Sequence, residues 1–314
     1  MTTESLTPPG QAEPPDLLAA GEPTSIRARS QLEIVWRRFT RHRVGLAAGI
    51  VLLLLVLMAV VYPMVSPIAV TDTATDVQNT GPGWPHLFGT GPLGEDIFVE
   101  VWYGGRTSLL VGLAAAVGAT VIGGILGSLA GYFGGWIDGV VTLVTDIFLA
   151  APTLAVLIAL GAVLGKLSLT MIIIIIGVLT WMQVARLVRA EFFALKEREF
   201  VLAARAVGAS PLRIMARHLL PNAISVLVVS ATLLVATAII LEATLSFLGV
   251  GLDILSNPSW GNLLNRAQEG ALLGFWWAIV FPGLAIVVTA LCVNFLGDAL
   301  RDALDPHAME SREK

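Results

Sequence analysis

The chain has 314 residues, of which 56% are hydrophobic and 13% are charged, whereas about 25% of the residues in a typical soluble domain are charged. Its mean hydropathy of +0.81 indicates a protein that crosses a membrane several times, so the solvent that matters is lipid. The single cysteine, Cys292, excludes an intrachain disulfide, and the four scattered histidines lack the spacing of metal ligands.

The first segment, residues 1–30, has no apolar core and is rich in Pro, Glu, Thr and Ala. It contains no visible signal peptide, and we expect a disordered cytoplasmic tail. Residues 31–65 are predicted to hold an amphipathic lead-in and a first membrane helix at about 44–62. Residues 66–105 are acidic and rich in Pro and Gly, which predicts a loop outside the cell.

Five further apolar runs approach or exceed the roughly 20 residues that a helix needs to cross a bilayer. Together with the first run they predict an all-α membrane protein with six transmembrane helices. Pro152 and Pro282 are expected to kink the third and the sixth of these helices. The five runs cover about 108–133, 140–164, 167–184, 223–248 and 275–296.

The basic residues orient these six spans. Six arginines precede the first span, seven Lys or Arg residues lie between the fourth and the fifth, and three follow the sixth, together 16 of the 19 in the chain. An even number of spans puts all three groups on one side of the membrane, which the positive-inside rule identifies as the cytoplasm. We therefore expect a multi-pass protein of the plasma membrane with both termini in the cytoplasm.

Small residues recur at every fourth position of the second span, ending in Gly123, Gly127 and Gly131. In lipid, such a ridge lets two helix backbones approach closely. The ridge therefore predicts helix packing, either inside this subunit or against a second membrane subunit.

Two acidic residues, Asp146 and Glu242, interrupt the apolar spans. A charge at the centre of a bilayer costs at least about 2.5–3.5 kcal/mol, so such residues usually face the interior of a helix bundle or a watery cavity. Each is a candidate for lining a translocation path. The alternative for each is a structural partner, such as a Ser or Thr on a neighbouring helix.

Residues 161–166, GAVLGK, resemble a phosphate-binding loop only faintly. The glycine spacing is one residue short, neither Ser nor Thr follows Lys166, and no strand precedes the run. We therefore expect no ATPase site of its own in this chain, and no catalytic residue, metal site or cofactor site.

A polar stretch between the fourth and fifth spans, EFVLAARAVGASPLRIMARHLLPN at 199–222, predicts two short helices. Phe200, Ala204 and Val207 recur with helical spacing, which predicts that the first helix is amphipathic. Gly208 is expected to end it, because glycine adopts the left-handed turn that follows many helices.

The second short helix is predicted to begin at Ser210, a good N-cap residue, with Pro211 in its first turn. Pro221 is expected to end this helix, and Asn222 to cap the fifth span. The two helices either lie as an amphipathic hairpin on anionic lipid or dock on a protein. The residues alone leave both possibilities open.

Several motifs between about residues 35 and 306 resemble one family. Leu202-Ala203-Ala204, Gly208 and Leu220-Pro221 resemble the EAA loop of bacterial ABC importer permeases, with Leu202 where that pattern has Glu. The run EFVLAARAVGAS is similar to the dipeptide and oligopeptide branch. Further similarities are FGT, LGED and YGGRTSL at 88–109, LSFLG and PSWG at 245–261, and GDALRDALDP at 297–306, which resembles the end of the "C" permease subunit.

The resemblance implies a type I ABC importer permease fold over residues 106–300, with a coupling loop at 186–221 and a cytoplasmic tail at 301–314. It implies a B-type sister permease, two ATP-binding subunits that hold ATP and Mg²⁺, an external binding protein and a peptide cargo, without nucleic acid. Arg205 and Glu199 would make polar contacts with an ATPase. The implied coupling element comprises Glu199, Phe200, Ala203, Ala204, Arg205, Gly208, Ala209, Ser210 and Pro211.

Two alternatives to a peptide importer are open. A transporter of the same architecture would carry nickel chelates, glutathione or haem, because a separate binding protein largely selects the cargo. A membrane enzyme would show catalytic residues clustered at one depth, and a proton-coupled carrier would usually show internal repeats with broken helices. The sequence shows no convincing sign of either.

Overall fold

The computed structural model describes residues 31–66, 77–165, 167–253 and 257–304. Within these ranges the chain is mostly helical, and β-structure is limited to two isolated bridges. The predicted tail at 1–30, the acidic residues Asp72 and Asp76, and the last residues of the chain, 305–314, lie outside the described residues.

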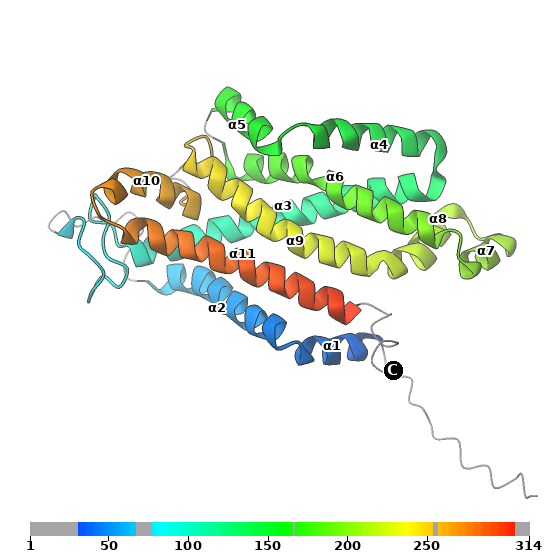
Figure 1. Ribbon diagram of the computed structural model, residues 1–314, viewed down its shortest axis with the longest axis horizontal. Coiled ribbons are helices and arrows are strands. Elements are labelled where there is room, and N and C mark those ends of the chain that lie inside the picture. Colours follow the sequence, from blue (N-terminus) through cyan, green and yellow to red (C-terminus); the bar gives the residue numbers. More distant parts are fainter. Residues whose placement is uncertain (1–30, 67–76, 166, 254–256, 305–314) are drawn as a thin grey trace, which may run out of the picture.

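Long apolar helices form a bundle (Figure 1). Five are long and apolar enough to cross a membrane, and a bent pair, α4 (Gly135–Ala150) and α5 (Thr153–Leu164), makes a sixth span if it is counted as one. The predicted all-α membrane architecture is therefore confirmed. The five long elements are α2 (Arg43–Val65), α3 (Ile97–Phe133), α6 (Leu169–Leu195), α9 (Leu220–Phe247), which continues from Pro211 without a break, and α11 (Trp277–Leu304).

The third predicted span is broken rather than kinked. Ala151 is extended, with φ −84° and ψ 134°, and the axes of α4 and α5 differ by 80°. Pro152 explains the break, because its ring disfavours a helical conformation of the preceding residue and it lacks the backbone N–H of a helix interior. Pro282 lies inside α11, which runs on through it.

Helices α3 and α6 are longer than the apolar runs suggest. Helix α3 begins at Ile97, inside the predicted outer loop, because the Asp96 carboxylate accepts hydrogen bonds from the backbone N–H groups of Phe98 and Val99. Helix α6 continues to Leu195 and so brings Arg186 and Arg189 into a spanning helix. The sequence had placed both arginines in a loop.

Short helices lie at the two ends of the bundle. Helix α10 (Trp260–Leu272) and the loop before α3 form one end, and α7 (Glu199–Ala206) and α8 (Pro211–Ile214) project from the other (Figure 1). Helix α1 (Gln31–Arg41) and the last turn of α11 lie toward the same end as α7. The basic groups at 37–43 and 186–217 therefore share an end of the molecule.

The small-residue ridge of α3 packs against α6 of the same chain. A side chain at Gly123, Gly127 or Gly131 would overlap the backbone of α6 at Trp181, Ala185 or Arg189, respectively. Helices α3 and α6 consequently share the most extensive contact in the fold. Their backbones approach closely because these positions have no side chain, as small-residue ridges permit in lipid.

Gly127→Ala tests this close approach. The added methyl group meets the backbone of Ala185, and we expect a loss of about 1–3 kcal/mol of stability from overpacking. The measurement is the thermal unfolding midpoint of the purified protein in detergent. Gly118→Ala, on the same helix but with no atom within 4 Å of the new methyl group, is the control and is expected to be neutral or stabilising. Equal midpoints for both variants would contradict the packing account.

Candidate functional site

The polar stretch forms a helical elbow, a name used here for residues 199–219. Helix α7 ends in a glycine turn: Gly208 has φ +82°, its N–H donates to the Arg205 carbonyl at 2.9 Å, and the Ala209 N–H donates to the Ala204 carbonyl at 3.0 Å. This hydrogen-bond pair is the Schellman arrangement, which requires a left-handed residue after the helix. The predicted role of Gly208 is thus found in the backbone.

The second half of the elbow differs from the prediction. Ser210 occupies the N-cap position and Pro211 the first turn, although the Ser210 hydroxyl makes no capping hydrogen bond. The helix does not end at Pro221. It passes through a π-helical turn, Met215–Leu219, directly into α9, and the Asn222 side-chain amide donates to the His218 carbonyl at 2.6 Å.

The π-helical turn explains why Pro221 does not end the helix. The Leu220 N–H donates to the Met215 carbonyl, five residues earlier. The hydrogen-bond register of the helix therefore changes just before Pro221, which has no N–H to donate. Such single π-turns accommodate irregularities that would otherwise break an α-helix. The expectation that Pro221 stops the second helix and that Asn222 begins the fifth span is therefore wrong.

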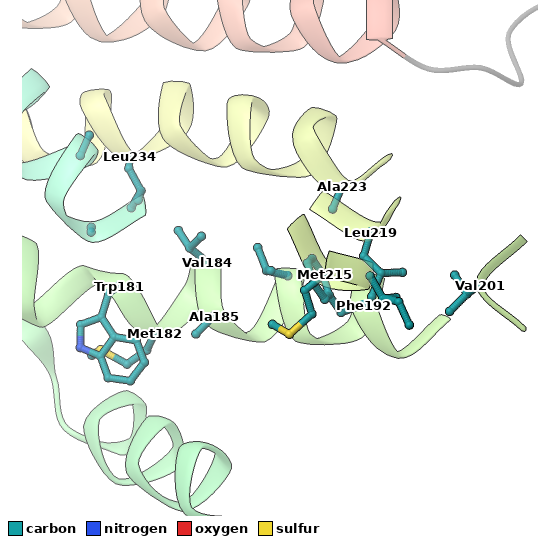
Figure 2. Packing of buried hydrophobic residues seen from close by; sticks show 14 residues of the cluster. Trp181, Met182, Val184, Ala185, Phe192, Val201, Met215, Leu219, Ala223 and Leu234 are labelled. Atoms are coloured by element: carbon teal, nitrogen blue, oxygen red, sulfur yellow. The ribbon is translucent and has the colours of Figure 1, made fainter. Parts of the chain in front are cut away.

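Apolar side chains anchor the elbow to the bundle. Val201, Ile214 and Leu219 have no exposed surface and belong to one cluster with Phe192 and Val184 of α6. Figure 2 shows Val201, Met215 and Leu219 converging beside Phe192 at the end of the bundle. Because both halves of the elbow contribute buried residues, α7 and α8 are fixed to the spanning helices on one face.

The other face of the elbow is apolar and exposed. Val207 is 88% exposed and Leu212 is 75% exposed, and Phe200 and Leu202 are also exposed. Of the predicted amphipathic face, Phe200 and Val207 are exposed and Ala204 is partly buried, whereas Val201 points into the bundle. The run of apolar residues from 200 to 202 fits two helical registers, and periodicity alone does not choose between them.

Glu199 and Arg205, the two residues predicted to make polar contacts with an ATPase, differ from each other in their surroundings. Glu199 is exposed. The Arg205 guanidinium lies over the ring of Tyr132, 5.5 Å from its centroid, within the range of a cation–π contact. Tyr132 belongs to the last turn of α3. Of the remaining coupling residues, Ala203, Ser210 and Pro211 are exposed and Ala209 is partly buried.

Asp146 and its surroundings form a charged strip between α4 and α6. The Asp146 carboxylate is 2.8 Å from the Arg186 guanidinium, and both side chains are more than half exposed, at 58% and 56%. A second pair, Asp138 with Arg189, joins the same two helices through two hydrogen bonds. Neither pair was predicted from the sequence, because Arg186 and Arg189 were both assigned to a loop; an Asp close to the end of a span was the available signal.

Glu242 is completely buried. Its carboxylate accepts hydrogen bonds from the Ser108 hydroxyl of α3 at 2.9 Å and from the Ser246 hydroxyl of its own helix at 2.8 Å. Ser108 in turn accepts the backbone N–H of Trp260 at 3.2 Å. This is the structural alternative considered for Glu242, and in this conformation the side chain has no surface toward a path.

The opposite end of the bundle carries a third charged group. The guanidinium of Arg266, on α10, pairs with Glu95 of the outer loop at 3.2 Å and with Glu100 of α3. Beside them lies an open hollow of about 450 Å³, lined in part by Leu93, Glu95 and Glu269. Across the described residues, no three His, Cys, Asp or Glu side chains are grouped to hold a metal ion.

Two protein-family models match the chain. Residues 123–309 match the binding-protein-dependent transport system inner membrane component family. Residues 30–82 match the N-terminal transmembrane domain of oligopeptide transport permease C. The first match includes the elbow, α4, α6 and Glu242, and the second includes α1 and α2.

Several individual proteins are similar over most of their length. A putative peptide permease protein of Brucella suis biovar 1 is 41% identical over 273 residues, which are 86% of this chain and 89% of the relative. The dipeptide transport system permease protein of Bacillus subtilis strain 168 is 40% identical over 88% of this chain and 86% of its own. A putative peptide transport system permease protein of Brucella abortus is 38% identical over 88% of this chain and 93% of its own.

Two substitutions at Glu242 distinguish the contribution of its hydrogen bonds to stability from the contribution of its side-chain volume. Glu242→Ala leaves a cavity and removes the partner of two buried hydroxyls, and we expect a loss of about 2–4 kcal/mol of stability. Glu242→Gln should cost less, because the amide keeps the volume and each serine keeps a partner once one hydroxyl reverses its role. Thermal unfolding in detergent measures both variants. If they lose the same stability, the serine hydrogen bonds do not hold Glu242 in place.

Proposed function

Because the chain belongs to the family of inner membrane components of binding-protein-dependent transport systems, we propose that it is the permease subunit of an ATP-driven importer of peptides. With a B-type sister permease it forms the translocation path for di- and oligopeptides. The helical elbow receives the driving motion from separate ATP-binding subunits. The observation that carries this proposal is an exposed apolar face on an elbow whose other face is anchored in the bundle.

The exposed face suits docking on an ATPase. Large apolar side chains are exposed along a segment that projects from the bundle, and exposed apolar surface of this kind marks interaction sites in proteins. They belong to Phe200, Leu202, Val207 and Leu212. Exposed Glu199 at the start of α7 is available for a polar contact. The exposed side chains of Ala203, Ser210 and Pro211 are small, so a groove on the ATPase can approach the backbone of the elbow. The Gly208 turn fixes the angle between α7 and α8.

The distribution of charge supports a cytoplasmic location for the elbow. The arginines of α1 and of residues 186–217 lie toward the same end of the bundle, and the positive-inside rule assigns such an end to the cytoplasm. Both chain termini are then cytoplasmic. Two ATPase subunits bind ATP and Mg²⁺ on this side, and this chain supplies no cofactor site. The binding protein delivers its cargo at the opposite end, near α10.

The Asp146–Arg186 pair supports a role of Asp146 in the path. More than half of each side chain is exposed on helices that span the membrane, where contact with lipid is costly for charges. A water-filled path between the two permeases gives both groups a polar surrounding. Glu242 has a structural role instead, because its carboxylate is enclosed by serines.

Charges introduced on the exposed face should separate docking from folding. Val207→Glu places a carboxylate in the proposed contact, and we expect the ATPase subunits to be lost from the purified complex while membrane insertion is kept. Leu272→Glu is the control, since Leu272 is equally exposed, at 90%, on α10 at the other end. Retention of the ATPases by Val207→Glu, or their loss from Leu272→Glu, would argue against docking at the elbow.

Gly208→Pro tests the shape of the elbow. Proline fixes φ near −65° and removes the N–H, whereas Gly208 has φ +82° and donates to Arg205. We expect transport to be abolished while the protein still inserts, as judged by uptake in cells and by membrane fractionation. Normal uptake by this variant would refute the coupling role.

Uptake by the reconstituted transporter tests the cargo. Proteoliposomes that contain both permeases and the ATPases, supplied with the binding protein and ATP, should accumulate a labelled dipeptide. An excess of unlabelled peptide should reduce that accumulation, and a nickel chelate, glutathione or haem should not. Accumulation of one of these solutes instead of peptide would assign the other cargo. Uptake by this chain alone without ATP would refute the importer class.

A further inference from the structure

Helix α4 is held loosely in the bundle. Thr145 is its one buried residue, and Trp136, Val140, Leu143 and Ile147 form an exposed apolar stripe at successive helical turns. By contrast, α6 buries many residues against α3 and α9. Segments with few buried apolar contacts open at lower free energy than the core of a protein, so α4 is the spanning element best suited to move.

The chain bends sharply or has flexible residues at both ends of α4. At its start, Gly134 and Gly135 have φ +65° and +57°, and neither has a neighbouring atom within 4 Å of the position of a Cβ. At its end, the chain turns by 80° at Ala151 and Pro152. Two consecutive glycines with positive φ, free of close neighbours, form a joint that changes its dihedral angles at little cost.

Charged groups tie α4 to α6 between these joints. Asp138 contacts Arg189, and Asp146 contacts Arg186 at 2.8 Å. The Asp146–Arg186 pair is more than half exposed, and exposed pairs of this kind are individually weak. Beside the break, an apolar hollow of about 170 Å³ separates Ile147 and Phe148 from Met182 of α6. The Asp146–Arg186 tie is therefore breakable, and α4 has space beside it to shift toward α6.

A side-chain contact connects the helical elbow to the first joint. Arg205 of α7 lies over the ring of Tyr132, and Tyr132 stands two residues before Gly134. Tyr132 also packs against the buried cluster that holds the elbow. A displacement of α7 therefore acts directly on the end of α3 at the point where the chain turns into α4.

We propose that Arg205 is a positioning residue that transmits the motion of the elbow, through Tyr132, to the glycine joint. Helix α4 then turns about Gly134 and Gly135, and its ion pairs with α6 are broken and replaced. This proposal rests on the proposed function, since it assumes that an ATPase moves α7. It gives Arg205 a partner inside this chain rather than on the ATPase. The role is one of positioning, because Arg205 touches neither nucleotide nor cargo.

The first experiment uses the complete transporter in proteoliposomes and compares Arg205→Ala, Tyr132→Leu and Tyr132→Phe. We expect Arg205→Ala and Tyr132→Leu to lower peptide uptake per ATP hydrolysed by about tenfold, the scale on which a lost coupling contact acts. Tyr132→Phe keeps the ring under Arg205 and should rescue uptake. The ATPase subunits should copurify with all three variants.

The outcomes of this experiment are distinct. If the ATPases are lost from Arg205→Ala, Arg205 is a docking residue, so the positioning role is overturned while the docking function stands. If the ATPases do not bind the unaltered chain, the proposed function itself fails. Unchanged uptake per ATP in Arg205→Ala, or a defect in Tyr132→Phe equal to that in Tyr132→Leu, overturns the proposed contact.

A second experiment follows α4 directly. Spin labels at Leu143 of α4 and Leu187 of α6, both exposed, are attached as single cysteines in a Cys292→Ser background of the complete transporter. We expect the distance between the labels to change when ATP is bound, and the change to be reduced in Gly134→Ala/Gly135→Ala, which strains the joint. A distance that is the same with and without ATP overturns the proposal.

Discussion

The molecule depends on the burial of a few apolar side chains at one end of the bundle. Val201, Ile214 and Leu219 join the elbow to the same cluster as Phe192 of α6. Without them α7 would be a tethered peptide, and a force on it would be lost in the flexibility of the chain. Because interiors are close-packed and transmit strain, these contacts let a push on the exposed face of the elbow reach the spanning helices.

The spanning helices differ in how firmly they are held. Helices α3 and α6 are joined along the glycine ridge, and Glu242 ties α9 to α3 through Ser108, so these elements move together. Helix α4 is attached by charged pairs and joints. A transporter needs both kinds of attachment, because a rigid body must carry the motion and a looser element must open the path. In this chain the small residues of α3 provide the firm attachment, and the charged residues of α4 provide the looser one.

The sequence predicted the features that depend on local chemistry. The spans follow from the length of the apolar runs. The close packing of the Gly123–Gly127–Gly131 ridge follows from residue size, and the turn at Gly208 follows from the tolerance of glycine for positive φ. Features that tertiary structure decides were not predicted. The π-helical turn carries the helix through Pro221, and the burial of Val201 selects one of two possible registers of α7. Ser108, which donates to Glu242, comes from a distant part of the chain, so no spacing in the sequence announces it, whereas Ser246 lies one turn away on the same helix.

The most direct test of the account is site-specific photocrosslinking in the assembled transporter. A benzophenone side chain at position 207, on the exposed face of the elbow, should crosslink to an ATPase subunit, and one at position 272 should not. That result would establish the elbow as the contact through which the chain is driven. Crosslinks from position 207 to lipid alone, or to an ATPase from position 272 instead, would contradict it.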